Sequence, residues 1–576
     1  MLKKYIPYIC IFLSAVMWVL CFDPFGIDEL AWVFLVPILI AQRNSAITKK
    51  RFFGLFFVCA LVWLAILIWL RHVYPPMGYV GLLLLPTAVA AFYAPWFLLI
   101  PKFFAKTTDS FYKRIFLMIS AASLWTTLEF LRSFMFTGFP WCFIAHSQYK
   151  KIALIQSASI GGIYLVSFII ILLNLGLANY ILHIWHYHKS KISNQKIVSK
   201  FCVEFYFAII VFLANLLFFV YHMPKANDYE YAFRAGSIQT NFVGFEKWDK
   251  EIIERNFEII SSLSLGLKEA NVNLILWPEA ATPPKFPMIG SDYTPIFAKD
   301  IAQNTNADML IGNMAMIEKD DNYFWKNSVF FISKKTGLAE EYYSKIHLVP
   351  FGEYLPFWCK FLKKVVPIGN MLEGDFHKPL NVQIASKDYK AGAMICYEDA
   401  FPELGRLMSA KDSDFLFVCT NDSWYGEEGG AYQHASHSAF QAIANRKVLL
   451  RSSNNGMSCA FNEHGQMFST ITLRDVDDKI WQGKTKIKRP LDVKNEQGVL
   501  LHPYTLKTLR PAPMLDDKDS IYFRGAGYTD IYFNKNFKNT KSFYTLYGFF
   551  VPYVFAFVSL IFLFSLAKAR FISKKA

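Results

Sequence analysis

The sequence predicts a polytopic helical membrane bundle joined to an α/β domain. Three observations predict it: apolar segments of membrane-spanning length gather at the two ends of the chain, the region between them alternates short apolar runs with amphipathic patterns, and the composition is strongly apolar. Of the 576 residues, 54% are hydrophobic, 17% are aromatic and only 18% are charged. A chain of this kind is too long for one compact core and too apolar for an ordinary soluble protein.

Seven apolar segments precede the α/β region and an eighth follows it. Most approach the roughly 20 residues with which a helix crosses a bilayer. The second is short and contains Pro37, and the first follows Lys3 and Lys4 as a signal peptide would. No small-residue cleavage site follows the first segment, so we expect a retained helix. The eight predicted spans are 5–21, 29–41, 53–70, 79–100, 115–131, 155–182, 203–221 and 545–567.

Basic residues alternate between the two sides of successive spans, which predicts cytoplasmic termini. Lys150 and Lys151 are exceptions on the outer side. The predicted organisation is a seven-helix transmembrane domain at 1–223, an extracytoplasmic domain at 224–543, and a final transmembrane helix with a cytoplasmic tail at 544–576.

The net charge of +15 does not indicate nucleic acid, because the basic residues lie beside apolar segments rather than on one polar face. The nine cysteines form no CxxC pair and no cluster with histidine, so we expect neither a metal nor another cofactor. The sequence does not decide whether two of the four cysteines in the α/β region form a disulfide.

The α/β region contains short β-rich runs that alternate with helical patterns. One amphipathic helix is predicted between Trp248 and Ala270. Polar residues with scattered proline and glycine fill 471–540, which we interpret as an extended or looped insertion. The predicted strands lie at 272–277, 309–313, 327–332, 391–397 and 415–420.

Three reactive side chains stand at the ends of predicted strands or in loops. Glu279 follows a buried strand that Pro278 ends, and Lys345 precedes a loop rich in turn residues and aromatics. Cys396 stands between an apolar strand and a helix that opens at Pro402, where free backbone N–H groups are expected to lower the pKa of its thiol and to bind an oxyanion. Taken alone, each residue is more simply a solvated carboxylate, a solvated lysine or a buried structural thiol.

Together these blocks resemble the nitrilase (carbon–nitrogen hydrolase) superfamily, in which Glu, Lys and Cys follow in this order. They read WPE, SKIHLVPFGE and ICYE. With eight spans around them, the chain is similar to the apolipoprotein N-acyltransferases over nearly its whole length. Further matching blocks are FTGFPW, IQTN, NDSWYG and RSSNNG. A departure from that pattern is an insertion of about fifty residues between Thr470 and Tyr544.

The resemblance implies an αββα sandwich on the periplasmic side of a bacterial inner membrane, and an acyl transfer through a thioester. Cys396 would take the acyl chain from a phospholipid, Glu279 would be the general base, and Lys345 with the Tyr397 N–H would stabilise the oxyanion. The acceptor would be the α-amino group of the lipidated N-terminal cysteine of a diacylated apolipoprotein. An α-amino pKa of about 8 leaves a useful fraction of it neutral.

Other residues match positions that support the reaction in this family. Glu353 and Glu398 are expected to support Lys345 and Glu279, although Glu398 is equally compatible with a helix cap. Trp248 and Trp424 are expected to line or gate the lipid entrance, with interfacial anchoring as the alternative.

Two further pairs of residues are assigned structural roles. His434 and His437 are expected on a surface helix rather than at a metal site, because no third ligand is near. Glu129 and Arg132 are spaced for an ion pair at the end of a span, with lipid headgroup contact as the alternative.

Two competing functions remain. A membrane-tethered amidase would use the same three residues with water as the acceptor, but the aromatic residues near the site do not favour a polar pocket. A transporter or receptor with an outer sensing domain would leave the three residues unexplained, and the spans carry few ionisable side chains for transport.

Overall fold

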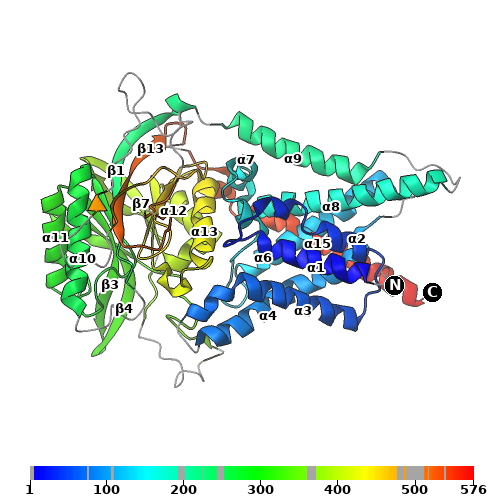
Figure 1. Ribbon diagram of the computed structural model, residues 1–576, viewed down its shortest axis with the longest axis horizontal. Helices are drawn as coiled ribbons and strands as arrows, with labels where there is room; N and C mark the ends of the chain where they lie inside the picture. Colours follow the sequence, from blue (N-terminus) through cyan, green and yellow to red (C-terminus); the bar gives the residue numbers. More distant parts are fainter. Residues whose placement is uncertain are drawn as a thin grey trace. The chain divides into compact units, whose positions relative to one another are not determined.

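A computed structural model of the chain describes two compact units, one formed by residues Met1–Met223 with Tyr547–Ala576 and the other by Pro224–Leu546 (Figure 1). The described residues are 5–575, except for 74–76, 106–108, 193–200, 224, 243–251, 358, 360–370, 376, 476–485, 488–511, 517 and 538–539.

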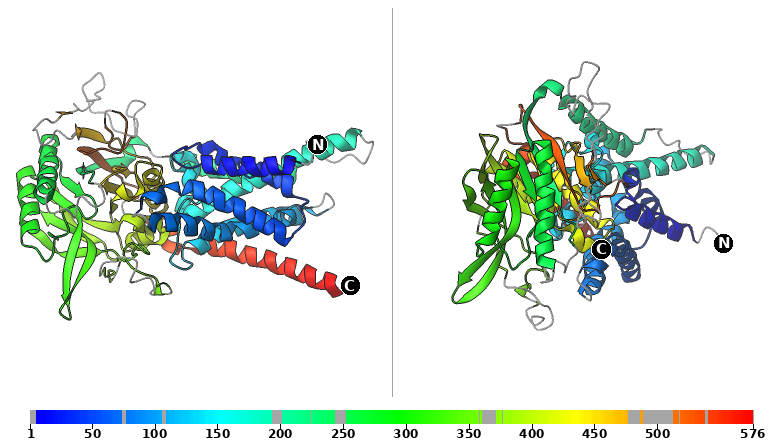
Figure 2. Two further views of the ribbon diagram at one scale, coloured as in Figure 1. Left: turned by 60° about the horizontal axis from the view of Figure 1, so that its bottom comes forward. Right: turned by 60° about the vertical axis from the view of Figure 1, so that its left-hand side comes forward.

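The first unit is built almost entirely of helices, which run as long rods in Figure 2. By length and composition, five of the described helices are apolar enough to cross a membrane: α4, α6, α8, α9 and α15. The helices of this unit are α1 (Ile6–Leu20), η2 (Asp28–Trp32), α2 (Val36–Gln42), α3 (Lys49–Ile66), η3 (Ile68–His72), α4 (Met77–Leu98), α5 (Ile100–Phe103), α6 (Phe111–Arg132), η4 (Ile144–Gln148), α7 (Ile152–Ile155), α8 (Ala158–Ile192), α9 (Val203–Tyr221) and α15 (Phe550–Lys575).

The predicted eight spans are therefore found only in part. The α1 helix has 15 residues, and α3 opens with three basic residues. The second predicted span is wrong as a single helix, because 29–41 divides into the short helices η2 and α2. Pro37 stands in the first turn of α2, where its missing N–H costs nothing, so the helix starts there.

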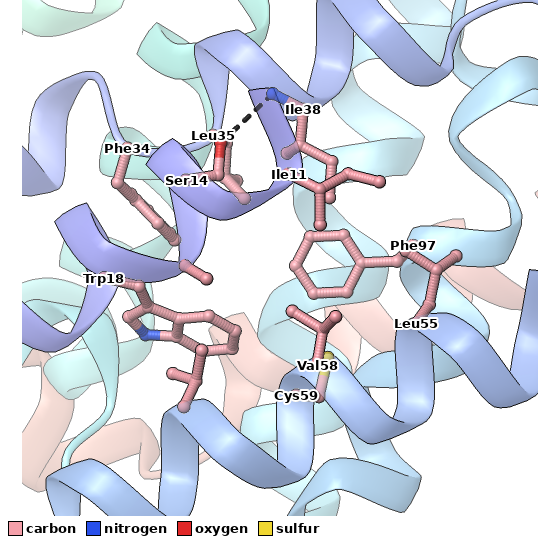
Figure 3. A pocket seen from close by; sticks show the side chains of 12 residues that line it. Ile11, Ser14, Trp18, Phe34, Leu35, Ile38, Leu55, Val58, Cys59 and Phe97 are labelled. Carbon is pink, nitrogen blue, oxygen red and sulfur yellow. Dashed lines mark hydrogen bonds between the residues drawn. The ribbon is translucent and has the colours of Figure 1, made fainter. Parts of the chain in front are cut away.

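Side chains from neighbouring helices hold this broken segment in place. The Asn174 amide on α8 accepts from the Leu35 N–H at 2.9 Å and donates to the Ala31 carbonyl at 2.9 Å. The Ser14 hydroxyl on α1 accepts from the Ile38 N–H at 3.1 Å, beside an apolar pocket lined by Trp18, Phe97 and their neighbours (Figure 3). Backbone groups at the first turn of a helix have no partner within the helix, and these side chains supply one.

The predicted ion pair between Glu129 and Arg132 is wrong. Glu129 accepts hydrogen bonds from the Trp125 indole N–H and the Ile144 N–H, both at 3.0 Å. The Arg132 guanidinium instead lies over aromatic rings, 4.6 Å from the centre of Trp63 and 4.8 Å from that of Phe143. A cation over a ring face is attracted by the ring quadrupole.

The second unit is a sandwich of two sheets between two helical layers. Its strands are β1 (Tyr229–Gln239), β2 (Leu274–Trp277), β3 (Asp308–Lys319), β4 (Asn322–Ser333), β5 (Gly337–Ser344), β6 (Leu380–Ile384), β7 (Lys387–Ile395), β8 (Phe415–Thr420), β9 (Val448–Ser453), β10 (Cys459–Phe461), β11 (Ile471–Asp475), β12 (Lys486–Ile487) and β13 (Gly525–Asn534). Its helices are η5 (Ala226–Asp228), α10 (Ile253–Gly266), η8 (Leu267–Ala270), α11 (Tyr293–Thr305), η10 (Cys396–Ala400), α12 (Pro402–Ala410), η11 (Asp422–Tyr425) and α13 (Gly430–Asn445), and the short α14 (Phe543–Tyr547) follows.

The larger sheet has the order β12-β11-β13-β1-β2-β3-β4-β5, and the smaller sheet has the order β10-β9-β8-β7-β6. Helices α10 and α11 pack on the larger sheet, and α12 and α13 pack on the smaller one (Figure 1). Strands β1 to β3 run parallel, as do β7 to β9, so the carboxyl ends of the central strands lie at a common edge within each sheet.

All five predicted strands and the predicted amphipathic helix are confirmed. The segment interpreted as an insertion at 471–540 contributes β11, β12 and β13 to the larger sheet. Strand β13 pairs with β1 from Tyr229–Asn534 to Gln239–Gly525, so it belongs to the middle of the sheet. All nine cysteines are free thiols, which answers the question of a disulfide.

We predict that Asn174→Leu lowers the thermal stability of the detergent-solubilised protein. The substitution leaves the Leu35 N–H and the Ala31 carbonyl without their partner, at a cost of about 1–3 kcal/mol for each buried group. Asn179→Leu is the matched control, because the Asn179 amide donates only to a carbonyl of its own helix. Equal melting temperatures for the two variants would contradict this role of Asn174.

Candidate active site

Glu279 lies just beyond β2, with its side chain 9% exposed. Its N–H donates to the Thr420 carbonyl at the end of β8, at 3.4 Å, so the carboxyl ends of the two sheets meet here. The Asn327 side-chain amide on β4 donates to Glu279 Oε1 at 2.7 Å. Gly312 on β3 leaves room for this corner, since a Cβ there would come within 2.6 Å of the Pro278 carbonyl oxygen.

Lys345 directly follows β5 and is 1% exposed. Its Nζ lies 2.9 Å from Glu353 Oε1 and 3.8 Å from Glu279 Oε1. Burial by itself lowers the pKa of Lys345, but the negative charges of Glu353 and Glu279 outweigh it, and the net direction is upward. The ammonium is therefore charged throughout the physiological pH range.

Glu353 fixes the loop that follows Lys345 as well as the ammonium. Its second oxygen accepts from the Val349 N–H at 2.7 Å, at the point where the loop turns. The loop also closes on itself, with the Phe351 N–H donating to the Tyr354 carbonyl at 2.8 Å. Glu353 thus lies where the sequence predicts it, in contact with Lys345.

Cys396 follows the last residue of β7 and begins η10, at the predicted corner between strand and helix. Its backbone has φ of 52°, in the left-handed region that residues with a Cβ rarely adopt. Such a conformation persists only where the surrounding structure enforces it, and it is typical of functional turns.

The expected lowering of the Cys396 pKa is wrong. Burial raises the pKa of this thiol, the negative charge of Glu279 raises it further, and the ammonium of Lys345 offsets only part of the increase. The Cys396 thiol is thus within electrostatic reach of both Glu279 and Lys345. The thiol is protonated at neutral pH, so a base must remove its proton before it can attack a carbonyl.

Glu398 connects the Lys345 loop to the Cys396 turn. One of its oxygens accepts from the N–H groups of Ile346 and His347, at 2.8 and 3.0 Å, and the other accepts from the Ile395 N–H at 2.8 Å. The Tyr343 hydroxyl donates to the same carboxylate at 2.9 Å. Glu398 is fully buried, and it caps η10 and anchors the loop at once, but it supports Lys345 and Cys396 rather than Glu279.

The remaining predicted residues are placed less centrally. The Tyr397 ring packs edge-on against Phe401, with centroids 5.0 Å apart. Trp424 lies half-buried in η11, and Trp248 lies outside the described residues. Within the described part of the chain, no group of three or more His, Cys, Asp or Glu side chains is placed to hold a metal ion.

The expected surface position of His434 and His437 is wrong, because both are at most 2% exposed on the buried helix α13. His434 contacts Asp399, Asp422 and Arg451, and no sequence pattern marks these three residues as functional. Asp422 lies in the sequence block NDSWYG and Arg451 in RSSNNG. Nothing in either block indicates that the two residues contact the same histidine.

Comparisons with known proteins first define the class. The carbon–nitrogen hydrolase family matches residues 234–475, which include Glu279, Lys345 and Cys396. A solved carbon–nitrogen hydrolase from Helicobacter pylori is 17% identical, covers 55% of this chain and 93% of its own, and gives a TM-score of 0.33.

The particular family follows from the rest of the chain. Residues 14–176 match the apolipoprotein N-acyltransferase N-terminal domain. The apolipoprotein N-acyltransferase of Geobacter metallireducens is 30% identical over 80% of this chain and 86% of its own length, and that of Rickettsia typhi is 28% identical over 65% and 71%. The chain belongs to the apolipoprotein N-acyltransferase family.

We predict that the alkylation rate of Cys396 by iodoacetamide rises with pH at a midpoint above the value of about 8.5 for a free thiol. Because Glu279 raises the pKa of this thiol and Lys345 lowers it, Glu279→Gln shifts the midpoint down and Lys345→Met shifts it up. Peptide mass spectrometry at each pH measures the rate. Shifts of the opposite sign would show that these charges do not act on Cys396.

We also predict that Glu398→Gln destabilises the second unit by about 2 kcal/mol or more, because an amide NH₂ then faces backbone N–H donors in a buried site. Denaturant unfolding followed by near-ultraviolet circular dichroism measures the loss. Glu403→Gln is the control, since the Glu403 side chain on α12 is 47% exposed and pairs only with Arg406. A Glu398→Gln variant as stable as this control would exclude the anchoring role.

Proposed function

We propose that this chain transfers a fatty acyl chain from a phospholipid to the α-amino group of the N-terminal lipidated cysteine of apolipoproteins, through a thioester on Cys396. The observation that carries the proposal is the buried cluster of a thiol, a carboxylate and an ammonium, in a chain that also has membrane-spanning helices. The names of the relatives support the substrate classes.

In the first half-reaction, the Cys396 sulfur attacks the ester carbonyl carbon of the phospholipid while Glu279 takes the thiol proton. The Lys345 ammonium and the Tyr397 N–H stabilise the oxyanion that forms, each donor contributing about 3 kcal/mol. The carbon–oxygen bond then breaks, and Glu279 returns the proton to the leaving oxygen. A lysophospholipid departs, and the acyl chain stays on sulfur.

In the second half-reaction, the neutral α-amino group attacks the thioester carbonyl and Glu279 accepts a proton from the amine. The same two donors stabilise the second oxyanion. When the carbon–sulfur bond breaks, the sulfur takes the proton from Glu279, and the free thiol is restored. An amide has formed, and Glu279 has carried one proton in each direction in each half-reaction.

The raised pKa of Cys396 fits this cycle. A permanently ionised thiolate would be a good leaving group, and its thioester would revert easily to the ester donor. A protonated thiol beside a base forms its nucleophile only when the substrate carbonyl is in place. Glu353 and Glu398 position Lys345 and the turn of Cys396, and Trp248 and Trp424 line the lipid entrance.

The protein is a membrane protein, and we place residues 224–543 on the periplasmic side of a bacterial inner membrane with both termini in the cytoplasm. The distribution of lysine and arginine between the loops supports this orientation. An esterified phospholipid and a lipidated protein terminus both reside in that membrane, so a site beside it reaches both substrates.

The test is intact mass spectrometry of the purified protein after exposure to vesicles of a phospholipid with one defined acyl chain. We expect the wild type to gain the mass of one acyl group, held as a thioester that an added thiol nucleophile removes. We expect Cys396→Ser to gain no adduct that can be removed in this way. Adding a diacylated lipopeptide discharges the adduct and yields the triacylated peptide. Release of free fatty acid with no acylated peptide would favour an amidase-like hydrolase, and a wild type without any adduct would refute the thioester.

A further inference from the structure

Beneath the Cys396 turn lies a cluster of four charged side chains that the mechanism above does not use. It comprises Asp399 on η10, Asp422 on η11, His434 on α13 and Arg451 on β9, and we call it the charge cluster. Each member is at most 1% exposed. Four separate segments of the chain contribute to it, so its assembly joins η10 to the three neighbouring elements.

Four contacts within the charge cluster pair opposite charges, and a fifth, between Arg451 Nη2 and His434 Nδ1 at 3.0 Å, brings the two basic side chains together. His434 Nδ1 lies 2.7 Å from Asp422 Oδ1, and His434 Nε2 lies 3.0 Å from Asp399 Oδ1. Arg451 spans the same two carboxylates, 2.8 Å from Asp399 Oδ2 and 2.9 Å from Asp422 Oδ2. Two anions and two cations then balance, which is the condition under which buried charges are tolerated.

A carboxylate lies beside each ring nitrogen of His434, which favours the imidazolium, the form with an N–H on both nitrogens. Burial lowers the pKa of His434, but Asp399 and Asp422 outweigh burial and the opposing charge of Arg451, and raise it to about 9. Burial raises the pKa of Asp399, while His434 and Arg451 outweigh it and bring it to about 2.

Two further rings pack around His434. The Tyr425 ring lies edge-on at 5.7 Å and the His437 ring at 6.3 Å, between ring centroids. Burial and the nearby negative charges raise the pKa of the Tyr425 hydroxyl and of the Cys396 thiol, so both are neutral at physiological pH.

The charge cluster contacts Cys396 through the backbone carbonyl of that residue. His434 Nε2 lies 3.3 Å from the carbonyl oxygen of Cys396. That carbonyl belongs to the peptide that joins Cys396 to Tyr397, a trans peptide in which the C=O and the N–H point in opposite directions. A hydrogen bond on its carbonyl therefore fixes the direction of the Tyr397 N–H, which the mechanism uses as an oxyanion donor.

We infer that His434 is a positioning residue, which holds the Cys396–Tyr397 peptide plane from behind so that the Tyr397 N–H points at the oxyanion. The inference rests on the proposed function, since it assigns a role to a group behind the same site. The positive charge on His434 also polarises this peptide, which makes the Tyr397 N–H a stronger donor. The left-handed φ of Cys396 explains why such a restraint is needed, because an unrestrained backbone would leave that region.

The test compares single-turnover acylation of Cys396 by phospholipid vesicles in the wild type, in His434→Gln and in His437→Gln. Removing an oxyanion donor costs about 100- to 1000-fold in rate, so loosening one is expected to cost about 10- to 100-fold in His434→Gln. The loss falls on the maximal rate, with the lipid concentration at half-maximal rate unchanged, because His434 does not contact the lipid. His437→Gln, on the same helix with its ring centroid 6.3 Å from that of His434, is the matched control and acylates as the wild type does.

A second variant separates positioning from mere stability. Asp399→Asn weakens the charge cluster but keeps His434 beside the Cys396 carbonyl. We therefore expect this variant to be less stable than the wild type, while its acylation rate falls by less than about threefold. If His434→Gln alone does not fold, the double variant His434→Gln with Asp399→Asn, in which the charges balance again, carries the same comparison. Rates that follow stability across all these variants would overturn the inference.

The ionisation of His434 gives an independent readout. A histidine whose folded pKa of about 9 exceeds its unfolded value of about 6.5 stabilises the fold fully below pH 6.5, and this contribution disappears as pH rises through 9. The difference in melting temperature between wild type and His434→Gln should therefore shrink between pH 6.5 and pH 9. A difference that stays constant over this range would contradict a charged His434. A wild type that forms no acyl adduct at all would instead count against the proposed function.

Discussion

The buried ammonium of Lys345 is the charge around which the site is organised. An unpaired cation at 1% exposure would be costly enough to lose its proton, so the fold must supply compensating anions. Glu353 does so at 2.9 Å, and Glu279 lies at 3.8 Å, near enough to stabilise the cation. The same carboxylate thereby serves both the neighbouring cation and the neighbouring thiol.

Compensation of charge also explains why the two sheets close at their carboxyl ends as they do. Glu398 satisfies backbone N–H groups from two loops, and Asn327 orients Glu279 from a third element. The accepting carboxylates of Glu398 and Glu279 are buried, so each small displacement would leave a polar atom without a partner. The arrangement is rigid because other conformations would leave buried polar groups without hydrogen bonds, which raises their free energy.

Sequence patterns were sufficient where one local rule decides the structure. Pro278 ends β2 and Pro402 opens α12, and strand periodicity located the central strands around them. The same rules failed where distant residues decide. Nothing near Pro37 reveals that Asn174 holds the broken helix, and the glycines of β13 hide its alternation of inward and outward residues.

The site shows the same division. Strand ends predicted Glu279, Lys345 and Cys396, but burial, which sequence does not give, reversed the expected pKa shift of the thiol. The sequence predicts a surface helix around His434. It does not predict burial there, because the partners of His434 come from three other segments of the chain. An isolated histidine in a sequence carries no mark of the carboxylates that fold against it.

The pairing of β1 with β13 has a consequence for how the protein is made. Tyr229 emerges from the ribosome long before its partner Asn534, so through most of translation β1 presents an uncovered edge on one side. The larger sheet can be completed only after β13 (Gly525–Asn534), almost 300 residues further along the chain, has been synthesised. A product truncated before β13 therefore lacks a finished larger sheet.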